Sequence, residues 1–287
     1  MGKQKLKGRR ALVTGASSGI GSALARTLAA EGADVLIVAR RQARLDALAA
    51  EIRADHGVEV DVLATDLAVP GAAETVFAYA TQGGKCVDVL VNNAGFGDYR
   101  YFLDAEWSRY VDLIQLNITT LTALCHRFLP SMVERGFGHV MNIASVAAYL
   151  PNPSFAVYAG SKVYVRNFSE ALDCELKGTG VRVICVSPGG TRTEFLDQAG
   201  QKLKKSGELA MMTSARCARI AVRKMLAGRR SVVIGFMNAL TMYSVRFLPR
   251  AWMPAMAKFT MDTGVERVRS VALPSPGTDD STSGTQS

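Results

Sequence analysis

The sequence predicts an α/β fold with a single domain, in which a doubly wound parallel sheet of about seven strands carries helices on both faces. Three observations lead to this prediction. Short β-branched runs alternate with segments of helical apolar periodicity. The runs are almost continuously apolar, as expected for strands buried on both faces. A glycine-rich segment directly follows the first run, at the carboxyl end where such sheets bind their ligand.

Strands are expected at seven positions along the chain. They are Arg10–Thr14, Asp34–Ala39, Val58–Ala64, Val87–Val91, His139–Ala144, Val181–Val186 and Ser231–Gly235. Between the first of them, apolar residues recur at helical spacing, for example at Ile20, Leu24 and Leu28. Right-handed crossovers between parallel strands then give a Rossmann fold. We assign residues 1–270 to this domain and expect residues 271–287, rich in Ser, Thr and Gly, to form a disordered tail.

The composition is that of an ordinary globular protein, with 48% hydrophobic and 21% charged residues over 287 positions. The net charge of +9 is unevenly spread, because residues 201–260 contain twelve Lys or Arg and one acid, Glu208. This excess indicates an anionic partner, such as a phosphorylated substrate, an acyl thioester or a membrane surface. A solvated helix face explains the same charge equally well. We expect no nucleic-acid partner.

Targeting and redox signals favour a cytoplasmic location. The N-terminus lacks the apolar segment of a signal peptide, and no apolar run reaches the ~18 residues of a membrane span. The five cysteines form no CxxC pair, which predicts buried thiols in a reducing compartment. No spacing of His, Asp or Glu predicts a metal site. Membrane association through the basic C-terminal region is kept as an alternative location.

The first predicted strand runs into Thr14-Gly15-Ala16-Ser17-Ser18-Gly19-Ile20-Gly21, after which a helix begins. Glycines permit a tight turn and close approach to a pyrophosphate, and the helix N-terminus offers free N–H groups and a positive dipole end. This context predicts dinucleotide binding. The segment also fits the GxSxG nucleophile elbow of hydrolases, which requires a histidine late in the chain. The three histidines, His56, His126 and His139, all lie in the first half, which disfavours that interpretation.

The end of the second predicted strand indicates which cofactor binds. An acidic residue there would bind a ribose 2′-hydroxyl, but Ala39 occupies the position and Arg40 follows it. A guanidinium suits a 2′-phosphate, so we expect NADP(H) rather than NAD(H). The alternative is an Arg40 that merely faces solvent.

Tyr158 and Lys162 are spaced i and i+4, which places them on one face of a helix. A free tyrosine has a pKa of about 10, and a nearby ammonium favours its phenolate, so the pair makes a usable general acid and base. Ser145 ends the fifth predicted strand, where its hydroxyl can bond a substrate oxygen. Taken alone, these features also fit an exposed helix pair and an ordinary strand-end hydroxyl.

In combination, the motifs of residues 8–235 resemble the classical short-chain dehydrogenase/reductase family. The cofactor turn, the Asn92-Asn93-Ala94-Gly95 motif and the spacing from Ser145 to Lys162 all match the family. The resemblance implies an NADP(H) site made of Gly15, Ser17, Ser18, Gly19, Ile20, Gly21, Arg40, Asp66, Leu67, Asn93, Ala94, Gly95, Tyr158, Lys162, Pro188, Gly189, Thr191 and Thr193.

The resemblance also implies roles for four catalytic residues. Tyr158 protonates the carbonyl oxygen as hydride arrives, or accepts the proton in the reverse direction, and Ser145 polarises that oxygen. Lys162 binds the nicotinamide ribose and lowers the pKa of Tyr158. Asn117 holds a water that connects Lys162 to solvent. Members of the family usually form homodimers or homotetramers through the helices that carry Asn117 and Tyr158.

The segment from about residue 192 to residue 263 covers the substrate in this family. It is rich in Met and aromatic residues, which predicts a hydrophobic substrate cleft. An interfacial helix rimmed by Arg246, Arg250 and Lys258, an oligomer contact and simple core packing are the alternatives. The stretch Arg229–Met261 is similar to a bacterial branch that includes long-chain oxoacyl reductases.

These inferences predict an NADPH-dependent carbonyl reductase that acts on a lipophilic ketone, such as a long acyl, steroid-like or bulky ketone. An NADP-dependent alcohol dehydrogenase working in the oxidative direction is the first alternative. A non-catalytic sensor or scaffold that binds NADP(H) is the second.

Overall fold

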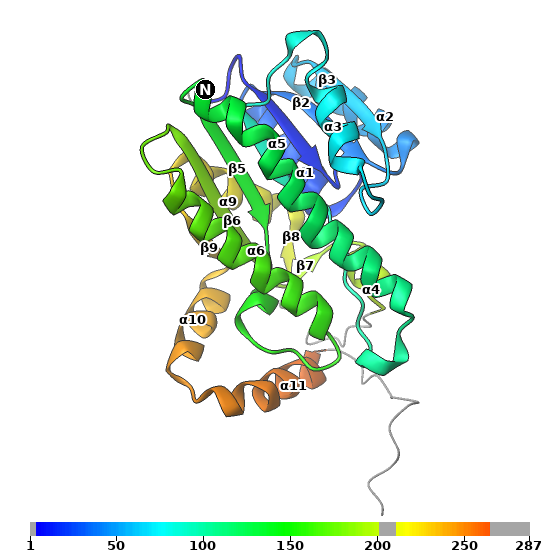
Figure 1. The fold of residues 1–287 in the computed structure, drawn as a ribbon, viewed down its shortest axis with the longest axis vertical. Helices are drawn as coiled ribbons and strands as arrows, with labels where there is room; N and C mark the ends of the chain where they lie inside the picture. The colour runs from blue at the N-terminus through cyan, green and yellow to red at the C-terminus, as the bar shows by residue number, and fades with distance from the viewer. Residues whose placement is uncertain (1–3, 201–210, 265–287) are drawn as a thin grey trace, which may run out of the picture.

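The computed structural model describes residues 4–200 and 211–264, which are built around a seven-stranded parallel sheet (Figure 1). Its strand order is β3-β2-β1-β4-β5-β6-β9. The strands are β1 (Arg10–Thr14), β2 (Asp34–Ala39), β3 (Val60–Ala64), β4 (Val89–Asn92), β5 (Gly138–Ile143), β6 (Val181–Pro188) and β9 (Ser231–Ile234). The predicted tail, 271–287, lies outside the described residues.

All seven predicted strands are confirmed, with boundaries that differ from the prediction by no more than two residues. The strand that extends furthest beyond its predicted end is β6, which continues to Pro188 because Pro188 still pairs with Ile234 of β9. A second, two-stranded sheet joins β7 (Thr191–Arg192) to β8 (Met212–Thr213), and it was not predicted. Strands of two residues are too short to show any periodicity in the sequence.

Burial on both faces of the sheet explains the continuous apolar runs. Ala11 and Val13 of β1 pack into one core, and Leu12 between them packs into the other. Helices α1, α2 and α9 cover the first core, and α3, α5 and α6 cover the second. In Figure 1, α5 and α6 lie in front of the sheet and α9 lies behind it. Apolar area removed from water on both sides is the main force that holds the three layers together.

The helices follow the strands in the order that a doubly wound sheet requires. They are α1 (Gly19–Ala30), α2 (Gln42–His56), α3 (Ala72–Ala80), α4 (Trp107–Ile114), α5 (Leu121–Glu134), α6 (Ala156–Glu175), α7 (Phe195–Gln198), α9 (Ser214–Leu226), α10 (Phe236–Ser244) and α11 (Met253–Gly264). A π-helical turn, Gln115–Thr120, joins α4 to α5.

Part of the basic C-terminal excess is a solvated helix face. Arg216, Arg219 and Arg223 of α9 are exposed, whereas Cys217 and Ala218 on the opposite side are buried against the sheet. This confirms the simpler interpretation of the charge for this helix.

After β9 the chain leaves the sheet and forms a hairpin of α10 and α11, seen at the bottom of Figure 1. The inner side of this hairpin is a small core that includes Met242, Val245 and Ala257. Its outer side exposes large apolar side chains, which are Phe236, Met237, Leu240, Tyr243, Phe247, Leu248, Trp252 and Phe259. Within residues 4–200 and 211–264, no helix has the length and apolar character needed to cross a membrane.

Candidate active site

A cavity of about 520 Å³ opens at the carboxyl ends of the strands. It lies where the strand order reverses, between β1 and β4, which is the position at which doubly wound sheets bind ligands. Every residue predicted to bind the cofactor lines this cavity. Ser145 lines it as well, whereas the fourth predicted catalytic residue, Asn117, lies behind its wall.

The glycine turn is fitted so closely to its surroundings that side chains are excluded from it. A Cβ atom at Gly21 would lie 2.2 Å from the carbonyl oxygen of Gly15 and 2.5 Å from the amide nitrogen of Asn93. Asn93 braces the turn, since its Nδ2 donates to the carbonyl oxygen of Thr14 at 2.9 Å. The turn therefore presents the N-terminus of α1 to the cavity with backbone alone, which fits a pyrophosphate.

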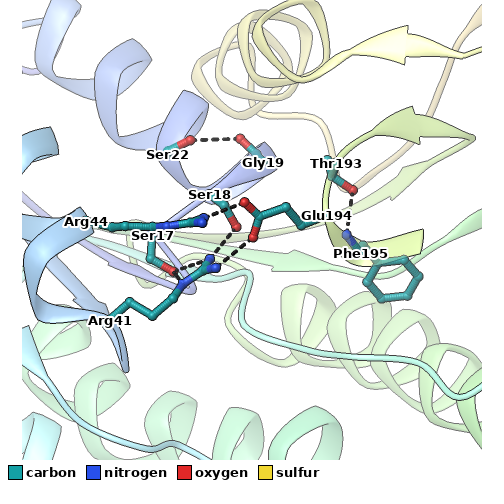
Figure 2. A network of polar contacts seen from close by, with 9 residues as sticks. All are labelled: Ser17, Ser18, Gly19, Ser22, Arg41, Arg44, Thr193, Glu194 and Phe195. Carbon is teal, nitrogen blue, oxygen red and sulfur yellow. Dashed lines mark hydrogen bonds and ion pairs between the residues drawn. The ribbon is translucent and has the colours of Figure 1, made fainter. Parts of the chain in front are cut away.

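Two consecutive arginines follow β2, and they lie differently. Arg40 is largely exposed, with its Nη1 atom 3.7 Å from Oδ2 of Asp66. Arg41 turns toward the glycine turn, where its Nη2 donates to Ser17 Oγ at 3.0 Å and to Ser18 Oγ at 2.9 Å (Figure 2). Arg41 also lines the cavity, and the sequence interpretation missed it. The Arg-Arg doublet was visible in the sequence, but only the fold shows which side chain reaches the turn.

Ser145 and Tyr158 come together at the middle of the cavity. Ser145 follows β5 and caps a 3₁₀ turn, because its Oγ accepts a hydrogen bond from the backbone N–H of Ala147 at 3.1 Å. Tyr158, in the first turn of α6, is buried and hydrogen-bonded to Ser145. Its ring stacks on Phe155 with centroids 4.2 Å apart and lies 5.4 Å from the ring of Phe195. Packing against Phe155 and Phe195 thus fixes the position of the Tyr158 ring, and with it the position of the Tyr158 hydroxyl.

Lys162 lies one helical turn beyond Tyr158. Its Nζ donates to the carbonyl oxygen of Ile143 at 2.8 Å and lies 5.7 Å from the centre of the Tyr158 ring. The side chain is buried, and its hydrogen bond to Ile143 holds it at the end of β5. The predicted i, i+4 pair therefore faces the cavity, not solvent.

Asn117 is held by the π-helical turn. Its Nδ2 donates to the carbonyl oxygen of Phe96 and to Ser161 Oγ, both at 3.1 Å, and its Oδ1 accepts from the backbone N–H of Phe96. A Cβ atom on Gly95 would lie 2.9 Å from Asn117 Oδ1 and 3.4 Å from Lys162 Nζ, so both side chains pack against the backbone of Gly95. The four predicted catalytic residues are therefore gathered in one place.

Burial dominates the protonation of the central pair. It raises the pKa of the Tyr158 hydroxyl to about 12, and the hydrogen bond from Ser145 offsets only part of that rise. Burial also lowers the pKa of Lys162 to about 8. The predicted lowering of the Tyr158 pKa by Lys162 is not found, because the Lys162 ammonium donates to the Ile143 carbonyl and Ser145 is the group that counters the effect of burial.

The cysteines and possible metal ligands add no chemistry to the cavity. Cys125, Cys185 and Cys217 are buried, and burial raises the pKa of each thiol to about 12, which makes them unreactive. Cys86 and Cys174 are exposed, contrary to the prediction of buried thiols. Across the part of the chain that the structure describes, no three His, Cys, Asp or Glu side chains gather as a metal site.

The family profile described as "short chain dehydrogenase" matches residues 9–204. The chain belongs to the short-chain dehydrogenase family. This short-chain dehydrogenase is therefore an oxidoreductase of CH–OH and C=O groups. The family assignment agrees with the fold, because the matched residues contain the first six strands of the sheet and the catalytic constellation.

Curated relatives match the same part of the dehydrogenase. A serine 3-dehydrogenase of Agrobacterium fabrum is 40% identical over 189 residues, which are 64% of this chain and 72% of that enzyme. A short chain dehydrogenase of Pseudocercospora fijiensis is 37% identical over 197 residues, which are 67% of this chain but only 62% of the fungal protein.

Solved structures extend the likeness over most of the chain. A short-chain dehydrogenase from Sphingobium yanoikuyae in complex with NADPH is 31% identical, with a TM-score of 0.76, and the match covers 83% of this chain and 92% of that one. A structure reported for 7β-hydroxysteroid dehydrogenase stereoselectivity is 28% identical, with a TM-score of 0.80, and covers 90% and 99% of the two chains. The dehydrogenase thus shares most of its architecture with these two structures.

The loop that follows β6 is supported by the C-terminal hairpin of the dehydrogenase. A Cβ atom on Gly189 would lie 2.0 Å from Nδ2 of Asn238, the third residue of α10. That nitrogen donates to the carbonyl oxygen of Ile234 at 3.0 Å. Asn238 therefore fixes the predicted nicotinamide loop to the end of β9, a role that the sequence interpretation did not assign.

The other end of the cavity is apolar. Its lining there comprises Phe96, Val146, Leu150, Phe155, Phe195, Leu196 and Met211. Only the last three belong to the segment that was predicted to form the substrate cleft. Within the described residues, the rest of that segment forms β8, α9, β9 and then the hairpin, with Met242 in the core of the hairpin and Phe247 on its surface, so only the first part of the segment lines the cavity.

Proposed function

We propose that this dehydrogenase is an NADPH-dependent carbonyl reductase that acts on a lipophilic ketone. One observation carries the proposal: a single cavity joins a glycine turn suited to a dinucleotide, a buried Tyr158–Ser145 hydroxyl pair and an apolar end. A carbonyl oxygen at the hydroxyl pair would have its carbon chain toward the apolar side chains. The same arrangement counts against a sensor, which needs no buried acid.

The chemistry assigned to the protein is positioning and proton transfer. When bound, the cofactor supplies the hydride. Ser145 donates a hydrogen bond that polarises the carbonyl oxygen, and Tyr158 donates the proton to the same oxygen. Because burial raises the pKa of Tyr158 to about 12, the phenol stays protonated at neutral pH and is ready to act as an acid.

The preference for NADP(H) rests on the arginines after β2. Arg41 lines the cavity beside the glycine turn, and Arg40 lines it next to Asp66. Both present guanidinium groups, which bind phosphate oxygens by paired hydrogen bonds. The NADPH of the Sphingobium yanoikuyae dehydrogenase, a structure of the same fold, supports the same cofactor for this chain.

Cofactor titration followed by a ketone series tests this function. NADPH should bind at least about tenfold more tightly than NADH, because one 2′-phosphate gains charge-assisted hydrogen bonds. The rate of NADPH oxidation should rise along a series of methyl ketones of increasing chain length. Equal binding of the two cofactors would contradict the cofactor assignment. Rates that fall with chain length would contradict the lipophilic substrate.

We propose that the outer side of the α10–α11 hairpin contacts an anionic membrane surface. Phe247 is 90% exposed and Trp252 is 65% exposed, far more than large aromatic side chains usually are. Arg246, Arg250 and Lys258 lie among them, and residues 231–261 contain no acid. Aromatic groups flanked by cations are the chemistry that binds the headgroup region of anionic bilayers. A hairpin seated on lipid would also bring lipophilic substrates to the cavity.

The two tryptophans provide a matched test of this contact. The Trp107→Phe variant leaves Trp252 as the sole fluorophore, and the Trp252→Phe variant leaves Trp107, which is 69% exposed on α4. With vesicles of phosphatidylglycerol and phosphatidylcholine, Trp252 emission should shift to shorter wavelength and Trp107 emission should not. Changing Arg246 and Arg250 to Gln should weaken binding about tenfold or more. Hairpin variants that change the molar mass in solution but not vesicle binding would show a self-association surface instead.

We also propose that the chain forms a homodimer or homotetramer, as the family resemblance implies. A second group of exposed apolar residues supports this proposal, and it lies along the segment that precedes Asn117. Its members are Phe102, Leu103, Trp107, Val111 and Ile114. Contiguous apolar patches of this kind commonly mark protein–protein contacts.

A further inference from the structure

The carboxylate of Glu194 bridges two arginines, Arg41 and Arg44, at the end of the cavity that Arg41 lines. Glu194 Oε2 accepts from Arg41 Nη1 at 2.7 Å, and Glu194 Oε1 pairs with Arg44 Nη1. Figure 2 shows Glu194 reaching across to both guanidinium groups. The arginines belong to the start of α2, and Glu194 directly precedes α7, so the bridge connects two walls that are 150 residues or more apart in sequence.

The bridge occupies the guanidinium that faces the glycine turn. Arg41 uses Nη1 for Glu194 and its remaining nitrogens for Ser17 and Ser18. The serine hydroxyls are neutral and can rotate to donate to a phosphate. A carboxylate can only accept, and it repels another anion at the same guanidinium. A 2′-phosphate that binds Arg41 therefore competes with Glu194 for the guanidinium.

The bridge is also weak enough to be displaced. The side chains of Arg41 and Glu194 are 37% and 40% exposed, and exposed ion pairs contribute little to stability. The two arginines lower the pKa of Glu194, so its carboxyl group is charged at neutral pH. A phosphate dianion carries more charge and more acceptor oxygens than this carboxylate, so it wins the exchange.

We propose that Glu194 is a specificity-determining residue, which occupies the Arg41–Arg44 pair, competes with a 2′-phosphate for it and so weakens the binding of NADP(H) selectively. This inference rests on the NADP(H) dependence proposed above. NAD(H) has no anion at that position and leaves the bridge intact.

The Glu194→Gln variant tests the inference, since it keeps the size of the side chain and removes its charge. Binding of NADPH and of adenosine 2′,5′-bisphosphate should tighten about threefold to fivefold, through faster association. Binding of NADH and of adenosine 5′-monophosphate should change by less than about 1.5-fold. The Glu51→Gln variant is the matched control, because Glu51 forms a similar exposed bridge with Arg26, away from the cavity lining.

Two results would overturn the inference. Weaker binding of the bisphosphate to the Glu194→Gln variant would mean that the carboxylate holds the arginines in place for the phosphate. Equal changes for NADPH and NADH would mean that Glu194 does not read the 2′-position. The bisphosphate carries no nicotinamide, so these readouts do not depend on turnover. A chain that behaves as expected here but reduces no ketone would contradict the proposed reaction and leave the role of Glu194 standing.

Discussion

Replacing Tyr158 with phenylalanine should lower the rate of ketone reduction by about a thousandfold or more, while NADPH affinity stays within about twofold. The variant removes one hydroxyl, the proposed proton donor, and keeps the ring that stacks on Phe155. Single-turnover NADPH oxidation measures the rate, and fluorescence titration measures the affinity. Loss of rate with retained affinity would separate chemistry from cofactor binding.

The Tyr164→Phe variant is a matched control for this experiment. Tyr164 lies on the same helix, α6, and its hydroxyl is hydrogen-bonded to Thr122 at 2.9 Å, outside the cavity lining. Its loss should leave the rate unchanged. If the Tyr158→Phe variant kept its rate within about tenfold of the parent, the hydroxyl would not be the acid, and a sensor or scaffold role would regain weight.

Replacing Lys162 with methionine should have two opposite effects. The rate should fall about a hundredfold or more, because the buried Lys162 ammonium lies beside Tyr158 in the cavity that the cofactor is proposed to occupy. The free energy of unfolding at pH 7 should rise, by about 1–2 kcal/mol. That gain is smaller than the full cost of charging a buried lysine, because the variant also loses the hydrogen bond to the carbonyl oxygen of Ile143.

The stability gain must depend on pH with a definite sign. Burial lowers the pKa of Lys162 from 10.5 to about 8, so protons bind more tightly to the unfolded chain than to the folded one. Below pH 8 the folded parent protein bears the full cost of the buried charge. Between pH 8 and 10.5 the amine is neutral in the folded protein but still charged in the unfolded chain, so this cost falls steadily and vanishes above pH 10.5. The advantage of the Lys162→Met variant should therefore shrink over this window.

Urea unfolding at pH 7 and pH 10 checks this prediction. The Lys177→Met variant, at an exposed position just after α6, controls for the loss of any lysine and should show no pH-dependent difference. If the stability advantage of Lys162→Met is absent at pH 7, or equal at both pH values, then burial does not disfavour the charged form of Lys162 in the folded protein.

The sheet could be predicted from the sequence because its central strands obey one strong rule, which the half-buried edge strand β3 follows less closely. A strand that is buried on both faces must be apolar at almost every position, as Leu36, Ile37 and Val38 of β2 are. Ser145, Tyr158 and Lys162 could be picked out from a strand end and from helical spacing, whereas Asn117 was assigned only through the family resemblance. The short β7–β8 pair and the hairpin could not be predicted, because their apolar residues fit a cleft, a core and a surface equally well.

Electrostatic details could not be predicted because they depend on where side chains point. The sequence places Arg40 and Arg41 side by side, but only Arg41 bonds Ser17 and Ser18. It likewise places Lys162 near Tyr158, but cannot show that its ammonium is committed to a backbone carbonyl. Such contacts arise between segments up to 153 residues apart, as for Arg41 and Glu194, and no local pattern records them.

The π-helical turn at Gln115–Thr120 sets a limit on how far this protein can be stabilised by engineering. A wide turn of this kind holds one residue more than an α-helical turn, and π-turns persist mostly where function needs them. Removing one residue would restore a regular rod from α4 through α5 and would rotate Asn117 by about 100° away from Phe96 and Ser161. A more regular helix would thus remove Asn117 from its contacts with Phe96 and Ser161. Thermostabilising designs that idealise helices should therefore leave this turn unchanged.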